Sequence, residues 1–359
     1  MTIKTDVLII GGGFAGVSVA QALEKQGIQT TLVDRKDYFE VTFATLRNTT
    51  APQITKNQAR KNYKDFLSGR FIQNSVINMT NNTVHLSDGV EITFEQGIIA
   101  SGTRYPSMPM AKTDTAIDIH SRNQELLNYH KQLKSANKIM VIGGGVVGVE
   151  LAGEIAYAMP KAQVSLAHNS DVLLNGFKEK AQKKAQQQLE DLGVNIIFNS
   201  RYQQKDGRYV NRNSGIASDA DLVFEATGVL PNNDFLKPNM AKILNEQGFV
   251  SVNEHLEVLD YKNLYALGDI ADIGEAKLGY LAQEQGNYVA KSIIKKRKGK
   301  PSKAYKRNPL MALIPVGQKR GVVQLPFAVT TLKQLVNLKQ KDLFIGKIYK
   351  AFGTSPNTQ

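Results

Sequence analysis

The chain of 359 residues contains no cysteine, and this absence removes two kinds of chemistry. Without a pair of thiols there is no redox reaction through a dithiol and its disulfide, so glutathione-, lipoamide- and thioredoxin-reductase chemistry is excluded. There is also no thiolate to bind a metal ion. Histidine is scarce, and the five histidines show no metal-ligand spacing. We therefore expect no bound metal.

Long apolar runs are missing as well. No apolar stretch reaches the ~18 residues that a membrane-spanning helix needs. The longest candidate, residues 310–329, is interrupted by Lys319 and Arg320. The chain enters its first predicted strand directly, which leaves no room for a cleavable signal, and Thr2 stands where myristoylation requires glycine. These absences predict a cytoplasmic protein that contacts at most the inner face of the cell membrane.

Acidic residues are almost absent from residues 291–350, where Asp342 is the one acid among 16 lysines and arginines. This segment accounts for the net charge of +13, because the rest of the chain is close to neutral. Apolar residues recur in its second half at spacings of three and four: Leu332, Leu335, Val336, Leu338, Ile345, Ile348, Tyr349 and Phe352. The pattern predicts a basic amphipathic element on an anionic membrane surface. The alternative is a terminal helix that packs on the core and leaves a solvated basic face.

Glycine, by contrast, is abundant at two places 132 residues apart. The first is a G-x-G-x-x-G fingerprint between a predicted strand, residues 6–10, and a predicted helix, residues 17–26. Its glycines allow a tight turn, close approach to a pyrophosphate, and packing of helix on strand. The next predicted strand ends at Asp34, where a carboxylate can accept a hydrogen bond from a ribose hydroxyl. The candidate contacts of this first dinucleotide site are Gly11, Gly12, Gly13, Phe14, Ala15, Gly16 and Asp34.

The second fingerprint follows the predicted strand 138–142 and begins another predicted helix. Two dinucleotides are therefore expected to bind. Its candidate contacts are Gly143, Gly145, Val146, Val147, Gly148 and His168. His168 takes the place that corresponds to Asp34, without a carboxylate and without an arginine for a 2′-phosphate, so the choice between NADH and NADPH stays open. An ordinary polar residue at a strand end is the other interpretation of His168.

Turns of small residues follow two buried strands. Ala100-Ser101-Gly102 has a near copy that includes Thr227-Gly228, and a third apolar strand ends at Gly268-Asp269. Small residues are needed where a strand end meets a flat ring or another backbone, and the Asp269 carboxylate can accept from ribityl hydroxyls. The segments 71–77, 83–86 and 92–94 alternate in polarity, which predicts a small antiparallel insert.

This order of motifs predicts an α/β fold with two Rossmann-like dinucleotide-binding domains, the second inserted in the first, and a basic C-terminal segment. The predicted boundaries are 1–111 with 250–300 for the first domain, 112–249 for the second, and 301–359 for the segment. The hydrophobic content of 42% is enough for two or three cores.

From end to end the motifs resemble the two-dinucleotide flavoprotein superfamily. The narrower resemblance is to the ferroptosis suppressor proteins, also called apoptosis-inducing-factor-like oxidoreductases, with type II NADH dehydrogenases as relatives. It is carried by residues 33–37 with Leu46-Arg47, by 148–152, by 252–256, and by 280–282 with the tail. Thr2 departs from the family, because vertebrate members carry a lipid anchor on an N-terminal glycine. Tyr280 and Glu284 depart from the glutamines of type II dehydrogenases.

The resemblance implies FAD in the first domain, NAD(P)H in the second, and a quinone as electron acceptor. It adds Arg35, Lys36, Arg47 and Val76 to the expected FAD contacts, beside Asp269. Glu150 would lie by the nicotinamide and flavin rings as the catalytic candidate, and Tyr280, Lys339 and Phe344 would line the acceptor side. The alternative for Glu150 is an acid that stabilises the dipole of its helix.

We therefore expect an FAD-dependent NAD(P)H:quinone oxidoreductase. The alternatives are a soluble reductase of a small iron–sulfur protein or of oxygen, whose basic tail docks an acidic partner, and a redox protein that binds nucleic acid. The last is disfavoured, since the tail offers few aromatic residues to stack on bases. The sequence leaves open the identity of the quinone and whether the protein forms a homodimer.

Overall fold

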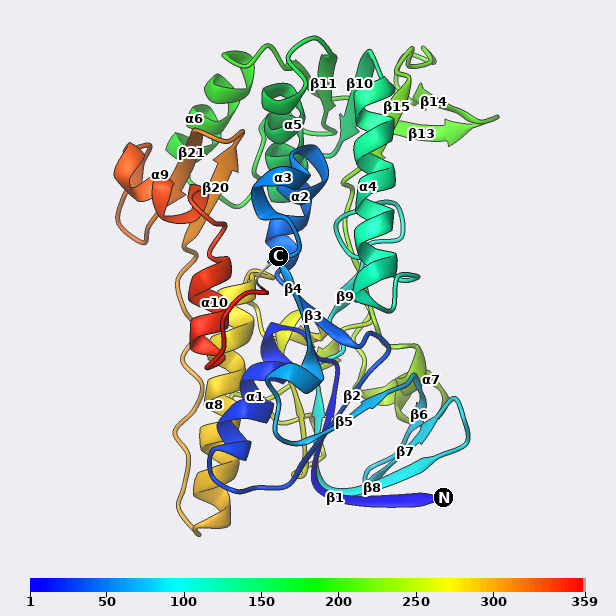
Figure 1. The fold of residues 1–359 in the computed structure, drawn as a ribbon, viewed down its shortest axis with the longest axis vertical. Helices are drawn as coiled ribbons and strands as arrows, with labels where there is room; N and C mark the ends of the chain where they lie inside the picture. Colours follow the sequence, from blue (N-terminus) through cyan, green and yellow to red (C-terminus); the bar gives the residue numbers. More distant parts are fainter. Residues whose placement is uncertain (358–359) are drawn as a thin grey trace.

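The computed structural model describes residues 1–357 and contains two mainly parallel sheets at opposite ends of a long molecule (Figure 1). The first sheet has the strand order β5 (Arg70–Gln73), β2 (Thr30–Asp34), β1 (Thr2–Ile10), β8 (Glu91–Ile99), β7 (Thr83–Leu86), β6 (Val76–Met79). Strand β18 (Leu264–Ala266) also pairs with β8, in parallel. Helices α1 (Phe14–Glu24) and α8 (Gly279–Arg297) pack against each other beside this sheet.

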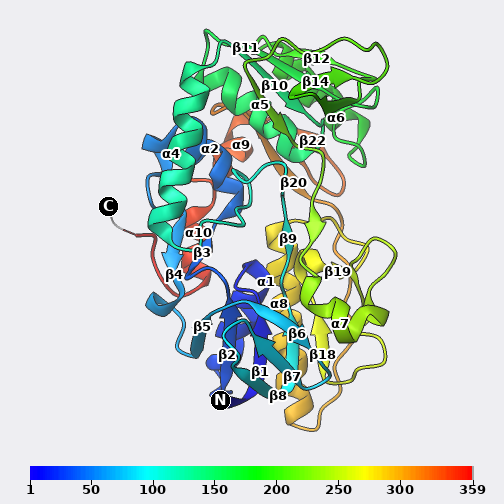
Figure 2. The same ribbon diagram turned by 90° about the vertical axis from the view of Figure 1, so that its right-hand side faces the viewer.

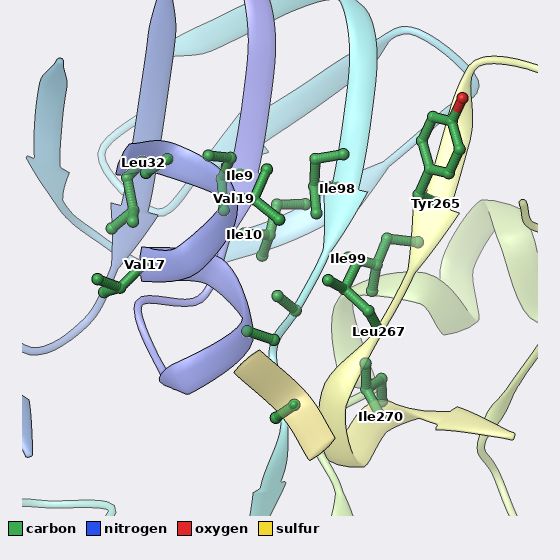
Figure 3. Packing of buried hydrophobic residues seen from close by; sticks show 14 of the residues in the cluster. Ile9, Ile10, Val17, Val19, Leu32, Ile98, Ile99, Tyr265, Leu267 and Ile270 are labelled. Atoms are coloured by element: carbon green, nitrogen blue, oxygen red, sulfur yellow. The ribbon is translucent and has the colours of Figure 1, made fainter. Parts of the chain in front are cut away.

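The core of the first sheet explains why these segments become strands. Ile9, Leu32 and Ile98 lie on three neighbouring strands and are at most 1% exposed (Figure 3). Runs of branched apolar residues that are buried on both faces are typical of parallel strands under helices. Val17 and Val19 cover them from α1, and Tyr265 and Leu267 extend the same core on the other side of β8.

The second sheet has the order β12 (Asn195–Ile197), β11 (Gln163–Ala167), β10 (Lys138–Ile142), β15 (Leu222–Glu225), and all its pairs are parallel. Its helices are α4 (Ile119–Ser135), α5 (Val146–Ala158) and α6 (Glu179–Glu190), and β13 (Tyr202–Lys205) forms a hairpin with β14 (Arg208–Asn211). Because β18 follows this sheet in the chain yet joins the first, the second domain is inserted in the first. The predicted fold class is confirmed.

The predicted antiparallel insert is partly wrong. Residues 70–73 form the edge strand β5 and pair in parallel with β2, so they belong to the main sheet. Residues 92–94 and 97–99 are one continuous strand, β8, which pairs with β1 along nearly its whole length. Only β6 and β7 form the antiparallel addition. Alternation of polarity does not separate an edge strand of a parallel sheet from a strand of a hairpin.

The segment between β2 and β5 reaches from the first domain to the second. It contains β3 (Tyr38–Glu40), α2 (Thr45–Thr50), α3 (Pro52–Thr55) and β4 (Arg60–Asn62). Helix α2 packs against α4 and α5, and Figures 1 and 2 both place it beside α4. Short elements lie near the places where the chain passes between the domains. They are the strand pairs β9 (Thr103–Arg104) with β16 (Leu230–Pro231) and β17 (Val250–Ser251) with β19 (Ala271–Asp272), and the short helix α7 (Lys237–Met240).

The C-terminal segment divides the predicted basic amphipathic element between the core and the surface. Strands β20 (Ala312–Val316), β21 (Arg320–Gln324) and β22 (Val329–Thr330) form an antiparallel sheet against α5 and α6, followed by α9 (Lys333–Gln340) and α10 (Ile345–Ala351). Ile345, Ile348, Tyr349 and Phe352 are buried in the core of the first domain. Apolar residues at helical spacing are compatible with a protein core as well as with a lipid interface. In this protein the apolar residues from Ile345 onward pack in the core.

Within residues 1–357 no helix is both long and apolar enough to cross a membrane. The same described residues contain no group of three histidines or acidic residues placed to hold a metal ion.

Candidate active site

The first glycine loop joins β1 to α1 at the carboxyl edge of the first sheet. Gly11 has φ +101°, and a Cβ there would lie 2.4 Å from the carbonyl oxygen of Ala100. A Cβ on Gly16 would lie 1.9 Å from the carbonyl oxygen of Gly11. Gly13 is different, because no atom lies within 4 Å of its Cβ position, and it precedes α1 without any side-chain cap. The first and last glycines are thus required by packing, while Gly13 leaves an open cradle at a helix N-terminus.

The second loop repeats this geometry. Gly143 has φ +116° and meets the carbonyl oxygen of Ala226, and Gly148 meets the carbonyl oxygen of Gly143. Gly145 again has nothing within 4 Å of its Cβ position. The two small-residue turns found in the sequence are therefore the backbone that each loop packs against. Both cradles fit the pyrophosphate of a dinucleotide, since helix N-termini offer free N–H groups and a favourable dipole to an anion.

Asp34 and His168 hold the two loops in the same way. The Asp34 carboxylate accepts from the N–H of Gly12 at 2.6 Å, and Nδ1 of His168 accepts from the N–H of Gly144 at 3.0 Å. Burial lowers the pKa of His168, which favours the neutral imidazole that this bond requires. His168 thus replaces the acid as an acceptor for the loop and brings no carboxylate to this position.

The turn at Gly268 and Asp269 lies against the first loop. A Cβ on Gly268 would lie 3.2 Å from the Cβ of Ala15, and the turn lines a small pocket with the residues that lead into α8. The Asp269 carboxylate accepts from Lys112 Nζ at 2.7 Å and from Thr103 at 3.0 Å. Burial raises the pKa of this carboxyl. Lys112 and these hydrogen bonds lower the pKa and together outweigh burial, so the net shift is downward. The turn therefore carries a fixed anionic acceptor.

Glu150 forms the most distinctive contact at the domain junction. Its carboxylate accepts from Lys339 Nζ at 3.0 Å, and both side chains are at most 10% exposed. Burial raises the pKa of Glu150, Lys339 lowers it, and the net shift is upward. Glu150 lies beyond the first turn of α5. The helix dipole acts mainly within the first turn, so this position favours a role in the pair over a dipole role.

An aromatic pair links Lys339 to the start of α8. The Lys339 ammonium lies 5.5 Å from the centroid of the Phe43 ring, and Phe43 stacks on Phe14 of the first glycine loop at 5.5 Å. A Cβ on Gly279 would lie 3.2 Å from the Phe14 ring, next to Tyr280. The first loop, the start of α8 and the Glu150 pair therefore converge on one region between the domains.

Other predicted residues lie as follows. Arg35 pairs with Asp114 at 2.9 Å, and the Lys36 ammonium lies over the Tyr38 ring. Val76 begins β6 and packs on the first core. Ser101 donates to the backbone carbonyl of Asn232, and Gly102 has φ +66°. Val146 and Val147 pack on the second core. Thr227 is exposed, and the N–H of Gly228 donates to the Tyr105 hydroxyl. Their cofactor contacts stay predictions.

Arg47, Tyr280 and Lys339 have polar partners within the protein, and Phe344 packs on the first core. Arg47 is 2% exposed and forms an ion pair with Glu154 of α5. The Tyr280 hydroxyl donates to the carbonyl of Pro309, and Phe344 has φ +58° just before α10. Lys339 meets Glu150, whereas Phe344 packs on the first core.

Sequence reasoning missed Phe43, Tyr63, Lys112 and Glu154. Tyr63 donates to the carbonyl of Gly12, and its ring fills the space beside that glycine. Only Glu154 had a signal in the sequence, because it lies four residues after Glu150 and so on the same face of one helix. Phe43 and Tyr63 lie in the segment between β2 and β5, and Lys112 lies between β9 and α4; no periodic pattern marks these positions.

Two glycine loops of equal geometry, on two Rossmann-like domains, define a two-dinucleotide flavoprotein. A family model described as pyridine nucleotide-disulphide oxidoreductase matches residues 5–286, and the chain belongs to this family. Human ferroptosis suppressor protein 1 is 31% identical over 98% of this chain and 96% of its own length. Apoptosis-inducing factor homolog A of Dictyostelium discoideum is 31% identical over 90% of this chain and 85% of its own length.

The structure of NDH2 from Plasmodium falciparum in complex with NADH covers 97% of both chains with a TM-score of 0.74 and 14% identity, a likeness of fold. The protein is thus an oxidoreductase that uses FAD and NAD(P)H. Although its family is named for disulfide chemistry, this chain has no cysteine and cannot form a redox disulfide of its own.

Proposed function

We propose that the protein is an FAD-dependent NAD(P)H:quinone oxidoreductase. The observation that carries the proposal is the buried Glu150–Lys339 pair at the junction where both domains and the start of α8 meet. Ferroptosis suppressor protein 1, to which the chain is similar over nearly its full length, supports the choice of a quinone. We assign FAD to the first domain, residues 1–111 and 250–300, and NAD(P)H to the second, residues 112–249.

The side chains bind and orient the reactants. The open cradle at Gly13 would hold the FAD pyrophosphate, and the Asp269 carboxylate would accept from its ribityl hydroxyls. Gly145 would hold the pyrophosphate of NAD(P)H. When bound, FAD supplies the two-electron chemistry between NAD(P)H and the quinone. Glu150 orients the nicotinamide or handles a proton, and Lys339 donates to its carboxylate in a buried setting.

The test is Glu150→Gln, which keeps the size of the side chain and removes its charge. We expect a normal content of FAD and a fall of ~10-fold or more in quinone reduction, as for the loss of a general acid–base group. The measurement is anaerobic reduction of the flavin by NADH and NADPH, followed by addition of menaquinone or ubiquinone. Normal kinetics in the variant would refute the role of Glu150, and a flavin that NAD(P)H reduces but no quinone reoxidises would refute the acceptor.

We also propose that the protein contacts the anionic cytoplasmic face of the cell membrane through the part of the C-terminal segment that stays exposed. Phe327 is 98% exposed at the turn between β21 and β22, and Leu332 and Leu338 are 58% and 60% exposed. Lys333 and Lys341 at the two ends of α9 are exposed as well. Apolar side chains that enter the lipid interface, with basic residues worth about 1 kcal/mol each near an anionic surface, give reversible binding.

Phe327→Ser should weaken sedimentation with anionic liposomes several-fold and leave flavin reduction by NAD(P)H unchanged. The reason is that the ring is exposed and lies outside both glycine loops. Ile216→Ser is the matched control, because Ile216 is 68% exposed on the second domain. Equal liposome binding by wild type and the Phe327 variant would contradict membrane contact at this turn.

A further inference from the structure

A second buried ion pair lies next to the Glu150–Lys339 pair. Arg47 of α2 meets Glu154 of α5 with 2.5 Å between Nη2 and Oε1, and its Nε lies 3.1 Å from the same oxygen. The two side chains are 2% and 3% exposed. Since Glu154 follows Glu150 by four residues, the two acids lie one above the other on α5. Glu150 pairs with Lys339 of α9, and Glu154 pairs with Arg47 of α2.

Gln340 joins the two pairs. It directly follows Lys339 in α9, and Arg47 donates both to its backbone carbonyl, at 3.1 Å, and to its side-chain oxygen. The Gln340 amide donates in turn to the carbonyl of Gly317, in the turn after β20, at 2.8 Å, and to that of Arg320, at the start of β21, at 2.6 Å. Arg47 is therefore bound to the residue next to the one that meets Glu150.

The packing around this cluster leaves little room for adjustment. A Cβ on Gly153, between the two acids on α5, would lie 2.8 Å from the backbone nitrogen of Gly317. Helix α9 has only eight residues, of which Val336, Lys339 and Gln340 are buried. With one apolar anchor, so short a helix depends on polar contacts to fix how it lies against α5.

We infer that Arg47 and Glu154 are positioning residues of the reaction, which hold Gln340 and so place Lys339 on Glu150. A buried ion pair adds little net stability, because removing both charges from water offsets their attraction, but its geometry is strict. This inference rests on the proposed function, in which Glu150 serves hydride transfer at the nicotinamide. It differs from the resemblance, which assigns Arg47 to the FAD.

The two charges also act on Glu150 with opposite signs. Burial raises the pKa of Glu150 and Lys339 lowers it; after these, Glu154 raises it and Arg47 lowers it. These three charged groups come from α9, α5 and α2, the elements that pack around the carboxylate. Removing the charge of Arg47 should raise the pKa of Glu150 further, and removing the charge of Glu154 should lower it.

The first experiment uses Gln340→Leu, which breaks the link and changes no charge. The rate of flavin reduction by NADH or NADPH should fall about 10-fold while the FAD content stays normal. Gln188→Leu is the matched control, because Gln188 also donates to a backbone carbonyl of this sheet, that of Gly321 at 3.2 Å, but among the described residues has no hydrogen bond to α9. Equal rates in wild type and the Gln340 variant would overturn the inference.

The second experiment follows flavin reduction as a function of pH. If ionised Glu150 is required, the rate rises with pH through its pKa, and Glu150→Gln loses this rise. Arg47→Met should move the rise to higher pH and Glu154→Gln should move it to lower pH. The double variant Arg47→Met/Glu154→Leu has no unpaired buried charge, so it should fold, and its rise should return toward that of wild type.

The outcomes separate the two proposals. If Glu150→Gln keeps the pH-dependent rise, the role of Glu150 in the proposed function fails. If that rise is lost in Glu150→Gln but the Arg47 and Glu154 variants shift it in the same direction or not at all, the positioning role fails. If the Arg47 variant and the double variant lose FAD while Glu154→Gln keeps it, Arg47 is a flavin contact and the inference is wrong.

Discussion

Gly13→Val should give a folded protein that no longer holds FAD. No atom lies within 4 Å of the Cβ position at Gly13, and its φ of −74° is one that valine adopts without strain. The branched side chain would instead fill the cradle at the start of α1, where the pyrophosphate approaches the backbone. The purified variant should be colourless, with a far-ultraviolet circular dichroism spectrum like that of the wild-type apoprotein.

The second loop provides the matched control. Gly145 has nearly the same backbone geometry, with φ −76°, and an equally open Cβ position. Gly145→Val should keep its yellow flavin and lose affinity for NAD(P)H, measured as a rise of 10-fold or more in the concentration that half-saturates flavin reduction. If the Gly145 variant were colourless and the Gly13 variant yellow, the assignment of the two loops would be reversed.

Removal of residues 342–359 should unfold the first domain. The buried side chains lost within the described part are Leu343, Ile345, Ile348, Tyr349 and Phe352. At about 2 kcal/mol each, their burial contributes roughly 10 kcal/mol, close to the whole stability of an ordinary domain. Thermal melting followed by flavin fluorescence would measure the loss. A truncated chain that keeps FAD and its melting temperature would show that these residues are not part of the core.

The sequence predicts the parts of the molecule that depend on local backbone geometry. Glycine at Gly11 and Gly143 is required by positive φ and by contact with a neighbouring strand, so both loops were found from their spacing. The small-residue turns were found for the same reason. The return of β18 to the first sheet followed from the order of the motifs, whereas the places of β5 and β8 in that sheet did not.

The parts that depend on contacts between distant segments were not predicted. Lys112 lies 157 residues from Asp269, and Arg47 lies 107 residues from Glu154, and no periodic pattern marks such pairs. The tail shows the limit of the hydrophobic pattern most clearly. The spacing of Tyr349 and Phe352 is compatible with a membrane surface or with a protein core. Only the folded structure, in which both residues pack on the core of the first domain, decides between these two locations.

The contact between the two ends of the described chain has a consequence for how the protein is made. The Gln21 amide of α1 donates to the backbone carbonyl of Phe352 at 2.6 Å, and the rings of Phe39 and Phe352 pack edge to face. The domain that begins synthesis therefore cannot close until residue 352 has left the ribosome, although domains usually fold in the order in which they emerge. Throughout translation the nascent first domain exposes an apolar surface, and prematurely terminated chains keep that surface open to chaperones and proteases.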